Sequence, residues 1–265
     1  MRTQRFERDG TTLIAERRDG DGAPLVIVPG VMSDAQTWRA VVDALPLPNP
    51  VIVLNRRGRV PSGPLGTGYS VRTEIDDLHH VLDILVVDED VELFGWSYGG
   101  LIALEAATER RGLRSVIAYE PVTRPFGVDA IAPLRSALDL GDLDQAVEIV
   151  KRTMAGYSAE YVTALRASAV WPVLRPLSHP LADELTAINT HPVALDRYRD
   201  INAPVTLLLG ELNENKPPYG TSFNTLAQAL PQARIVRLPG QGHLAHTEAP
   251  NLLAERIADA ITARP

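Results

Sequence analysis

The sequence predicts an α/β fold with a mostly parallel, doubly wound sheet and an inserted helical lid. Short apolar runs alternate with helical patterns in the first half of the chain and again near its end. Such alternation implies right-handed crossovers between parallel strands. The region between these two parts shows only helical segments broken by prolines. We therefore expect a core formed by residues 1–123 and 201–265, and a lid formed by residues 124–200.

Strands in the first half of the chain are expected at short apolar runs. Asp9-Gly10 is a common hairpin pair, so residues 3–18 are expected to form two strands. The later runs are continuous, which is typical of strands buried on both faces of a sheet. In chain order, we expect strands at 24–30, 51–54 and 115–119, helices at 34–45 and 71–85, and a strand–turn–helix unit at 91–110.

The second half of the chain begins with the lid and returns to the alternating pattern. A lid here would lie over the carboxyl ends of the strands, where open α/β sheets bind ligands. We expect lid helices at 129–138, 143–155, 159–169 and 181–188, then strands at 204–210 and 234–238 with helices at 222–230 and 251–262.

Composition limits the class of function. The net charge is −7 and no Lys/Arg run occurs, which argues against nucleic-acid binding. The absence of cysteine excludes disulfides, thiolate metal sites and cysteine nucleophiles. The N-terminal residues lack the apolar core of a signal peptide, and no apolar run is long enough to span a membrane. We expect a cytoplasmic protein that acts on a small molecule without a metal or other cofactor; the oligomeric state is left open.

The segment Gly95-Trp96-Ser97-Tyr98-Gly99 is the strongest chemical signal. It lies between an apolar strand pattern and a helical pattern, which is the context in which Gly-x-Ser-x-Gly forms a nucleophile elbow. Such a bend exposes the serine Oγ at the sheet edge, and the following helix directs its amide end at the site. Ser97 is therefore the candidate nucleophile.

A serine nucleophile needs a base within hydrogen-bond reach. Of the six histidines, His243 follows the last expected strand in a glycine-rich loop, so it can reach the edge where Ser97 lies. His246 is the fallback. The other four are expected to be solvated or packed, or to touch substrate at most; they are His79, His80, His179 and His191.

The chain resembles the α/β-hydrolase superfamily over nearly its whole length. The likeness rests on Val28-Pro29-Gly30-Val31, the Arg-Arg-Gly loop at 56–58, the elbow at 95–100 and the Gly-Gln-Gly-His loop with Glu248 and Pro250 after it. The resemblance implies an oxyanion hole formed by the amides of Tyr98 and Val31. Two positions depart from the family pattern: Pro29 replaces the usual histidine, and Gly58-Arg59-Val60 replaces Gly-x-Gly.

The acid of the triad is a third departure. The resemblance places it at position 213, which is an asparagine and cannot stabilise imidazolium by charge. Glu120, at the carboxyl end of the strand after the elbow helix, is the preferred replacement, and Glu211 and Glu214 are alternatives. Asp200 lies at the wrong end of the sheet.

Candidates for substrate contact are large side chains near the site: Met32, Trp96, Tyr157 and Trp171. For Tyr157 and Trp171, core packing is an equal expectation. The arginines at 56, 57 and 59 either bind an anionic substrate or form structural ion pairs.

These residues predict a serine hydrolase that cleaves an ester, lactone or thioester of a small apolar substrate through an acyl-enzyme. A serine nucleophile argues against epoxide hydrolase or dehalogenase chemistry, which uses an aspartate on this fold. Two alternatives stay open: a lyase, cyclase or synthase that uses the Ser–His pair for proton transfer, and a ligand-binding protein with an inactive triad.

Overall fold

A computed structural model of the chain describes residues 1–8, 10–85, 91–193 and 195–263. Its strands form one sheet in the order β1-β2-β4-β3-β5-β6-β7-β8. β1 pairs antiparallel with β2 and β2 antiparallel with β4, whereas all later pairs are parallel. The predicted hairpin is confirmed, but Asp9 of its turn lies outside the described residues. The strands are β1 (Arg2–Arg8), β2 (Thr11–Arg18), β3 (Leu25–Val28), β4 (Val51–Asn55), β5 (Val91–Trp96), β6 (Leu113–Tyr119), β7 (Val205–Gly210) and β8 (Arg234–Leu238).

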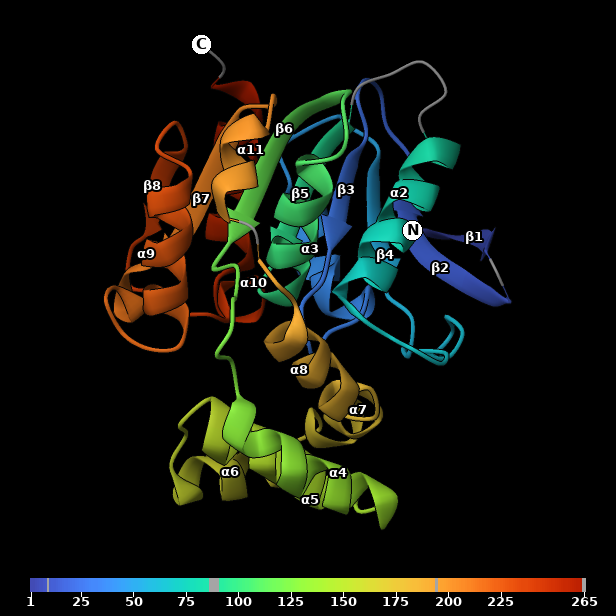
Figure 1. Cartoon of the computed structure of the whole chain (residues 1–265), viewed down its shortest axis with the longest axis vertical. Helices are drawn as coiled ribbons and strands as arrows, with labels where there is room; N and C mark the ends of the chain where they lie inside the picture. The colour runs from blue at the N-terminus through green and yellow to red at the C-terminus, as the bar shows by residue number, and fades with distance from the viewer. Residues whose placement is uncertain (9, 86–90, 194, 264–265) are drawn as a thin grey trace.

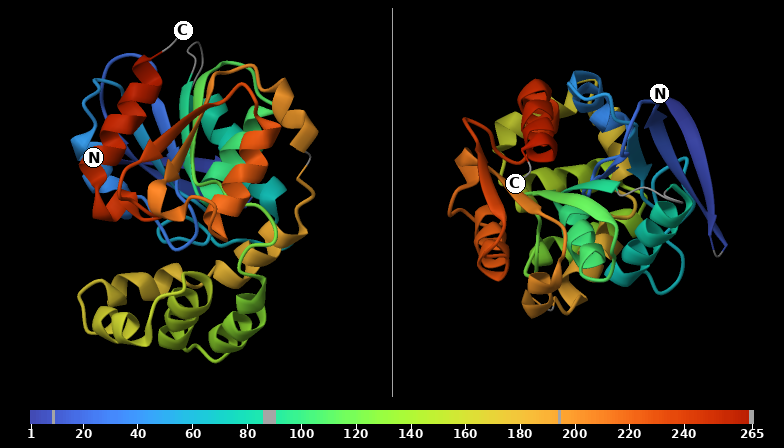
Figure 2. Two further views of the ribbon diagram at one scale, coloured as in Figure 1. Left: turned by 90° about the vertical axis from the view of Figure 1, so that its left-hand side faces the viewer. Right: turned by 90° about the horizontal axis from the view of Figure 1, so that it is seen from above.

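Helices cover both faces of this sheet (Figures 1 and 2). Apolar side chains of three helices pack on one face: α2 (Val71–Leu85), α3 (Tyr98–Ala107) and α9 (Tyr219–Ala229). The other face is packed by α1 (Arg39–Ala44) and α11 (Pro250–Thr262). Every residue of β3 and β5 is buried between these layers, and apart from Glu92 of β5 these strands carry no charged or polar residue other than the Trp96 indole N–H, as expected of strands covered on both faces. The α/β class with a doubly wound, mostly parallel sheet is thus confirmed.

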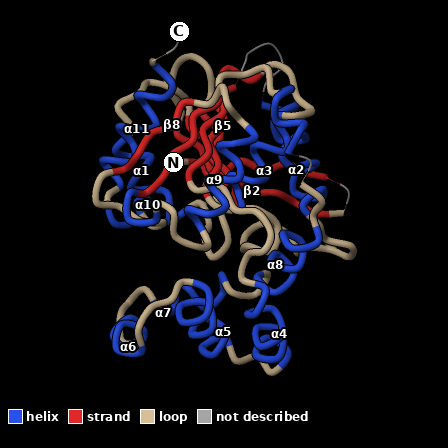
Figure 3. Tube along the Cα trace, turned by 60° about the vertical axis from the view of Figure 1, so that its left-hand side comes forward, coloured by secondary structure: helices blue, strands red, loops and turns tan. Residues whose placement is uncertain are grey.

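The segment between β6 and β7 carries a group of helices, which we call the cap. They are α4 (Ile131–Asp139), α5 (Leu143–Ile149), α6 (Ala159–Arg166), α7 (Trp171–Leu177) and α8 (Leu181–Thr190). Figures 1 and 3 show α4 to α7 as a separate layer beyond the carboxyl ends of the strands, with α8 between them and the sheet. A π-helical turn, Val150–Met154, continues α5 toward the core.

Two local expectations differ from the structure. The helix expected at 34–45 is divided into a 3-10 turn, Gln36–Trp38, and α1, because side chains take up backbone amides ahead of it. Asn55 Oδ1 accepts the Ala35 amide at 2.8 Å, and Asp34 Oδ1 accepts the Thr37 amide at 3.0 Å. Helix α7 was not expected, because its two prolines suggested a break. Pro172 lies in the first turn, where no amide hydrogen is needed.

A buried ion cluster joins α8 to the core. Glu184 of α8 accepts from Arg56 at 2.7 Å and from Arg59 at 2.8 Å, and Arg56 also donates to Glu74 at 2.7 Å. All four side chains are buried. Through Glu184, Arg59 ties the loop that lacks the second family glycine to the cap.

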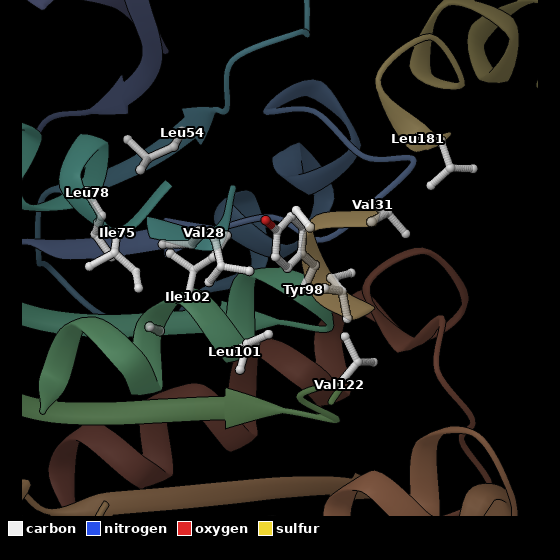
Figure 4. Close-up of a cluster of buried hydrophobic side chains, with 14 of the residues drawn as sticks. Val28, Val31, Leu54, Ile75, Leu78, Tyr98, Leu101, Ile102, Val122 and Leu181 are labelled. Atoms are coloured by element: carbon white, nitrogen blue, oxygen red, sulfur yellow. The ribbon is translucent and has the colours of Figure 1, made fainter. Parts of the chain in front are cut away.

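Apolar packing continues from the core to the cap at the same place. Figure 4 shows the ring of Tyr98 between Val28 and Val31, with Leu181 of α8 on the cap side. These residues belong to one buried cluster. No described helix is both long enough and apolar enough to cross a membrane.

Candidate active site

Ser97 lies at a sharp bend between β5 and α3. Its φ of 57° and ψ of −120° are unfavourable for a residue with a Cβ, as expected of a nucleophile elbow. The bend requires glycine on both sides: a Cβ on Gly95 would collide with the Gly99 carbonyl, and one on Gly99 with the Val28 carbonyl. The elbow predicted from the sequence is therefore formed.

Backbone strain is concentrated around this bend. Among the described non-glycine residues, positive φ occurs at Met32, Ser97, Glu120 and Asn215. The first three flank one cavity or contact its lining, so three of the four strained residues belong to one site. Strain of this kind persists where the surrounding structure holds a functional geometry.

Glu120 follows β6 and is completely buried. Its Oε2 lies 2.6 Å from His243 Nδ1. Its Oε1 accepts the Gly210 amide at 2.9 Å, and Asn213 Nδ2 donates to both carboxylate oxygens, at 3.0 and 2.9 Å. These donors compensate the carboxylate oxygens for the water lost on burial. The structure therefore brings together the preferred acid and the preferred base.

His243 is held from several sides. Trp96 Nε1 donates to its carbonyl at 2.9 Å, and the ring of Tyr219 stacks on the imidazole with centroids 3.6 Å apart. When Nδ1 is the donor in the contact with Glu120, Nε2 is the ring nitrogen left to act as a base.

Ser97, His243 and Asn213 line a cavity of about 330 Å³ between the core and the cap. The Ser97 hydroxyl is buried and has no hydrogen-bond partner among the described residues. Catalytic hydrogen bonds are often loose before substrate binds. The remaining lining is mostly apolar and comprises Val31, Met32, Trp96, Phe126, Val150, Lys151, Met154, Ala155, Tyr157, Leu212, Tyr219, Gly242, Leu244 and Glu248.

Three of the four predicted substrate contacts line this cavity: Met32, Trp96 and Tyr157. Trp171 does not line the cavity, and of the two expectations for this residue, packing is the one observed. Its indole packs against Val147 and Val162 within the cap, and its Nε1 donates to Asp144 Oδ1 at 2.7 Å. This partner is 27 residues away, so the sequence alone did not reveal it.

The alternative acids, Glu211 and Glu214, and the alternative base, His246, form other contacts. Glu211 accepts the Gly240 amide at 2.9 Å, and Glu214 binds Arg237. His246 is buried against Trp38 and Trp96. Burial, together with the charges of His243 and Lys151, lowers the pKa of His246 to about 3.

The arginine loop is structural. Arg56 Nε donates to the Pro29 carbonyl at 2.8 Å and its Nη2 to the Gly30 carbonyl at 2.9 Å. These bonds fix the backbone just before Val31, where the family histidine is missing. Arg57 binds Asp77 and Arg59 binds Glu184, and neither lines the cavity. Of the two expectations for these arginines, structural ion pairing is the one observed.

Two residues that line the cavity, Tyr219 and Lys151, were not predicted from the sequence. Tyr219 begins α9 directly after Pro217-Pro218, and only the fold places its ring on His243. Lys151 had a usable signal: it is one of only two lysines in the chain, the other being Lys216.

Comparison with known proteins agrees with this fold. The model of the alpha/beta hydrolase family matches residues 25–256. A 2-(acetamidomethylene)succinate hydrolase from Mesorhizobium japonicum is 24% identical over 96% of this chain and 93% of its own.

Two solved structures illustrate the shared fold. An alpha/beta hydrolase from Sphaerobacter thermophilus has a TM-score of 0.82 and 26% identity, covering 98% of this chain and 100% of that one. The enol-lactonase from Burkholderia xenovorans has a TM-score of 0.76 and 20% identity, with coverage of 98% and 100%. At that identity, the enol-lactonase supports the fold alone.

Proposed function

The chain belongs to the alpha/beta hydrolase family, and we propose that it is a serine hydrolase that cleaves an ester, lactone or thioester of a small, largely apolar substrate. One observation carries the proposal. A buried carboxylate, Glu120, contacts the ring of His243 in the cavity that also contains the elbow hydroxyl of Ser97. These are the three groups that nucleophilic acyl transfer requires.

In the proposed reaction, Ser97 Oγ attacks the acyl carbonyl while His243 Nε2 takes the hydroxyl proton. Glu120 holds the imidazole in the correct tautomer and stabilises the imidazolium. The amides of Tyr98 and Val31 bind the oxyanion. His243 then protonates the leaving group, and water, deprotonated by the same ring, releases the acid and regenerates the Ser97 hydroxyl.

The substrate class follows from the cavity. At about 330 Å³ it lies near the lower limit of small-molecule sites, and most of its lining side chains are apolar. The name of the Mesorhizobium relative describes hydrolysis of a small succinate derivative, which supports a small substrate here.

The non-hydrolytic alternative was kept open because Asn213 carries no charge to stabilise an imidazolium. Glu120 supplies the carboxylate from a different strand, and this favours hydrolysis. A ligand-binding protein with an inactive triad is distinguished by experiment.

The test is labelling by a fluorophosphonate, followed by turnover of short p-nitrophenyl esters. We expect wild-type protein to be labelled at Ser97 and Ser97→Ala to lose labelling and at least about 10³-fold in kcat. Ser136→Ala, which removes an exposed cap hydroxyl, is the control and should behave as wild type. A folded wild-type protein that resists labelling would instead favour ligand binding. Labelling without ester turnover would favour the proton-transfer enzymes.

A further inference from the structure

Lys151 lines the cavity that also contains Ser97 and His243. It lies in the π-helical turn Val150–Met154, which ends with the Ala155 amide bound to the Val150 carbonyl at 3.0 Å. The Tyr157 amide binds the Lys151 carbonyl at 3.0 Å, so the backbone on the C-terminal side of the turn is also held. π-helical turns are rare and often occur at functional sites.

Among the described residues, no side chain forms an ion pair with Lys151. No carboxylate within the described ranges lies within 4.0 Å of its Nζ, whereas Arg56, Arg57 and Arg59 are each paired with a carboxylate. It is also the only lysine or arginine among the described residues that line the cavity. Glu248 lines the same cavity, but its side chain is exposed and forms no ion pair with Lys151.

Burial of an unpaired ammonium carries a cost. Burial lowers the pKa of Lys151, and no neighbouring carboxylate offsets this effect. The chain otherwise uses arginine almost exclusively, with two lysines among its 26 basic residues. The other lysine, Lys216, is exposed and donates to the Leu212 carbonyl at 2.8 Å. An unpaired cation facing a catalytic cavity is suited to bind an anionic group of the substrate.

We propose that Lys151 binds a carboxylate carried by the substrate, so that the preferred substrates are esters, lactones or thioesters of a dicarboxylic acid. This inference rests on the proposed hydrolase function for its substrate class. The ammonium and the carboxylate form a charge-assisted hydrogen bond while the apolar lining contacts the chain between the two carboxyl groups. No bond to Lys151 forms or breaks.

The first test measures binding without catalysis. Reductive methylation with ¹³C-formaldehyde places an NMR probe on both lysines, and Lys151→Met and Lys216→Met assign the two signals. We expect glutarate to shift the Lys151 signal and raise its pKa, while Lys216 stays unchanged. The neutral diol 1,5-pentanediol should leave both signals in place. A Lys151 signal that glutarate leaves unchanged, or that shifts no more than the Lys216 signal, would overturn the proposal.

The second test measures specificity. Mono-p-nitrophenyl glutarate is compared with p-nitrophenyl pentanoate, which replaces the carboxylate by a methyl group. We expect Lys151→Met to lower kcat/KM for the acid ester by roughly tenfold or more relative to its effect on the neutral ester. Lys151→Arg should keep most of the preference because it keeps the charge, and Lys216→Met should match wild type.

The two tests separate this inference from the hydrolase proposal. Equal losses on both esters in Lys151→Met would mean that Lys151 supports cap packing, which overturns the inference and leaves the hydrolase intact. If the wild-type protein hydrolyses neither ester and resists fluorophosphonate, the hydrolase proposal fails, and the NMR result alone decides whether Lys151 binds a carboxylate.

Discussion

The geometry of the site depends on the carboxylate of Glu120. Removing a charged group from water is costly unless donors replace the lost hydration. Here the Gly210 amide, the Asn213 side chain and the His243 ring all donate to it. Asn213 occupies the position where the family resemblance placed the acid, and it has become a donor to an acid on the neighbouring strand. Relative to the family pattern, the carboxylate has thus moved to position 120 and position 213 provides a hydrogen-bond donor to it.

This exchange predicts a rescue. Glu120→Gln should lower kcat about 10³- to 10⁴-fold, because the imidazolium loses its counter-charge and the tautomer is no longer fixed. Adding Asn213→Asp restores a carboxylate within the same hydrogen-bonded group, and we expect at least about a tenfold recovery in kcat. The measurement is steady-state hydrolysis of a p-nitrophenyl ester, with thermal unfolding of each variant to verify the fold.

The control for this rescue is Asn213→Asp in the wild-type background. It places two carboxylates side by side, so it should lower activity rather than raise it. A double variant no more active than Glu120→Gln would contradict the assignment of Asn213 to the same acid site.

At the residue scale, the sequence predicted what depends on local geometry. Ser97 was found because the elbow needs glycine on both sides, and Glu120 and His243 because they follow parallel strands that end at one edge. The sequence left Trp171 open between substrate contact and packing, because the bond of its indole N–H to Asp144 depends on how the cap folds. Lys151 was not predicted because the rarity of lysine in this chain does not show that the residue lines the cavity with Ser97.

At the scale of elements, α8 is fastened to the core by the ion cluster around Glu184. Burial opposes ionisation of this glutamate, but the guanidinium groups of Arg59 and Arg56 outweigh burial and lower its pKa below the ordinary value. A buried pair contributes little compared with apolar packing, yet removing one partner is strongly destabilising because the remaining charge is unpaired.

We therefore expect Glu184→Gln to lower the free energy of unfolding by about 3 to 5 kcal/mol. Asp183→Asn is the matched control: it is the preceding residue, and its half-exposed ion pair with Arg135 should contribute only about 0 to 1 kcal/mol. Urea denaturation of the three proteins measures both values. Equal, small effects for the two variants would show that the cluster does not stabilise the fold.

The same variant has a defined pH dependence. A glutamate with a lowered pKa contributes stability above its unfolded pKa of about 4.3, and this contribution is lost as the pH falls through the folded pKa. The difference between wild type and Glu184→Gln should be largest near neutral pH and shrink in acid. A difference that grows as the pH falls would contradict the assigned ion pairs.

Element boundaries show why sequence patterns were less accurate here. The core strands were predicted well because burial on both faces leaves a continuous apolar run. The helix at 34–45 was predicted too long because Asn55, from another strand, captures the Ala35 amide. Helix α7 was missed because a seven-residue helix with two prolines gives little periodic signal, and tertiary contacts in the cap stabilise it.

At the scale of the whole molecule, the cavity exists because the cap and the core each form part of its wall. The core supplies Ser97 and His243, and the cap supplies Val150, Lys151 and Met154. If the proposed function holds, substrate size is limited in part by cap side chains far in sequence from Ser97, and no motif in the sequence marks them.

This division predicts that the cap can be altered without damaging catalysis. Met154→Ala should enlarge the cavity from the cap side and shift the preferred p-nitrophenyl ester toward longer acyl chains. Each additional buried methylene contributes about 0.8 kcal/mol, or roughly fourfold in kcat/KM, so hexanoate should gain over acetate by about that factor or more. Leu140→Ala removes an exposed apolar side chain at the end of α4 and should leave the chain-length profile unchanged. Fluorophosphonate labelling of Ser97 should proceed in both variants at rates close to wild type, because neither change touches the elbow. A Met154→Ala profile identical to that of wild type would place the limit on chain length in the core rather than in the cap.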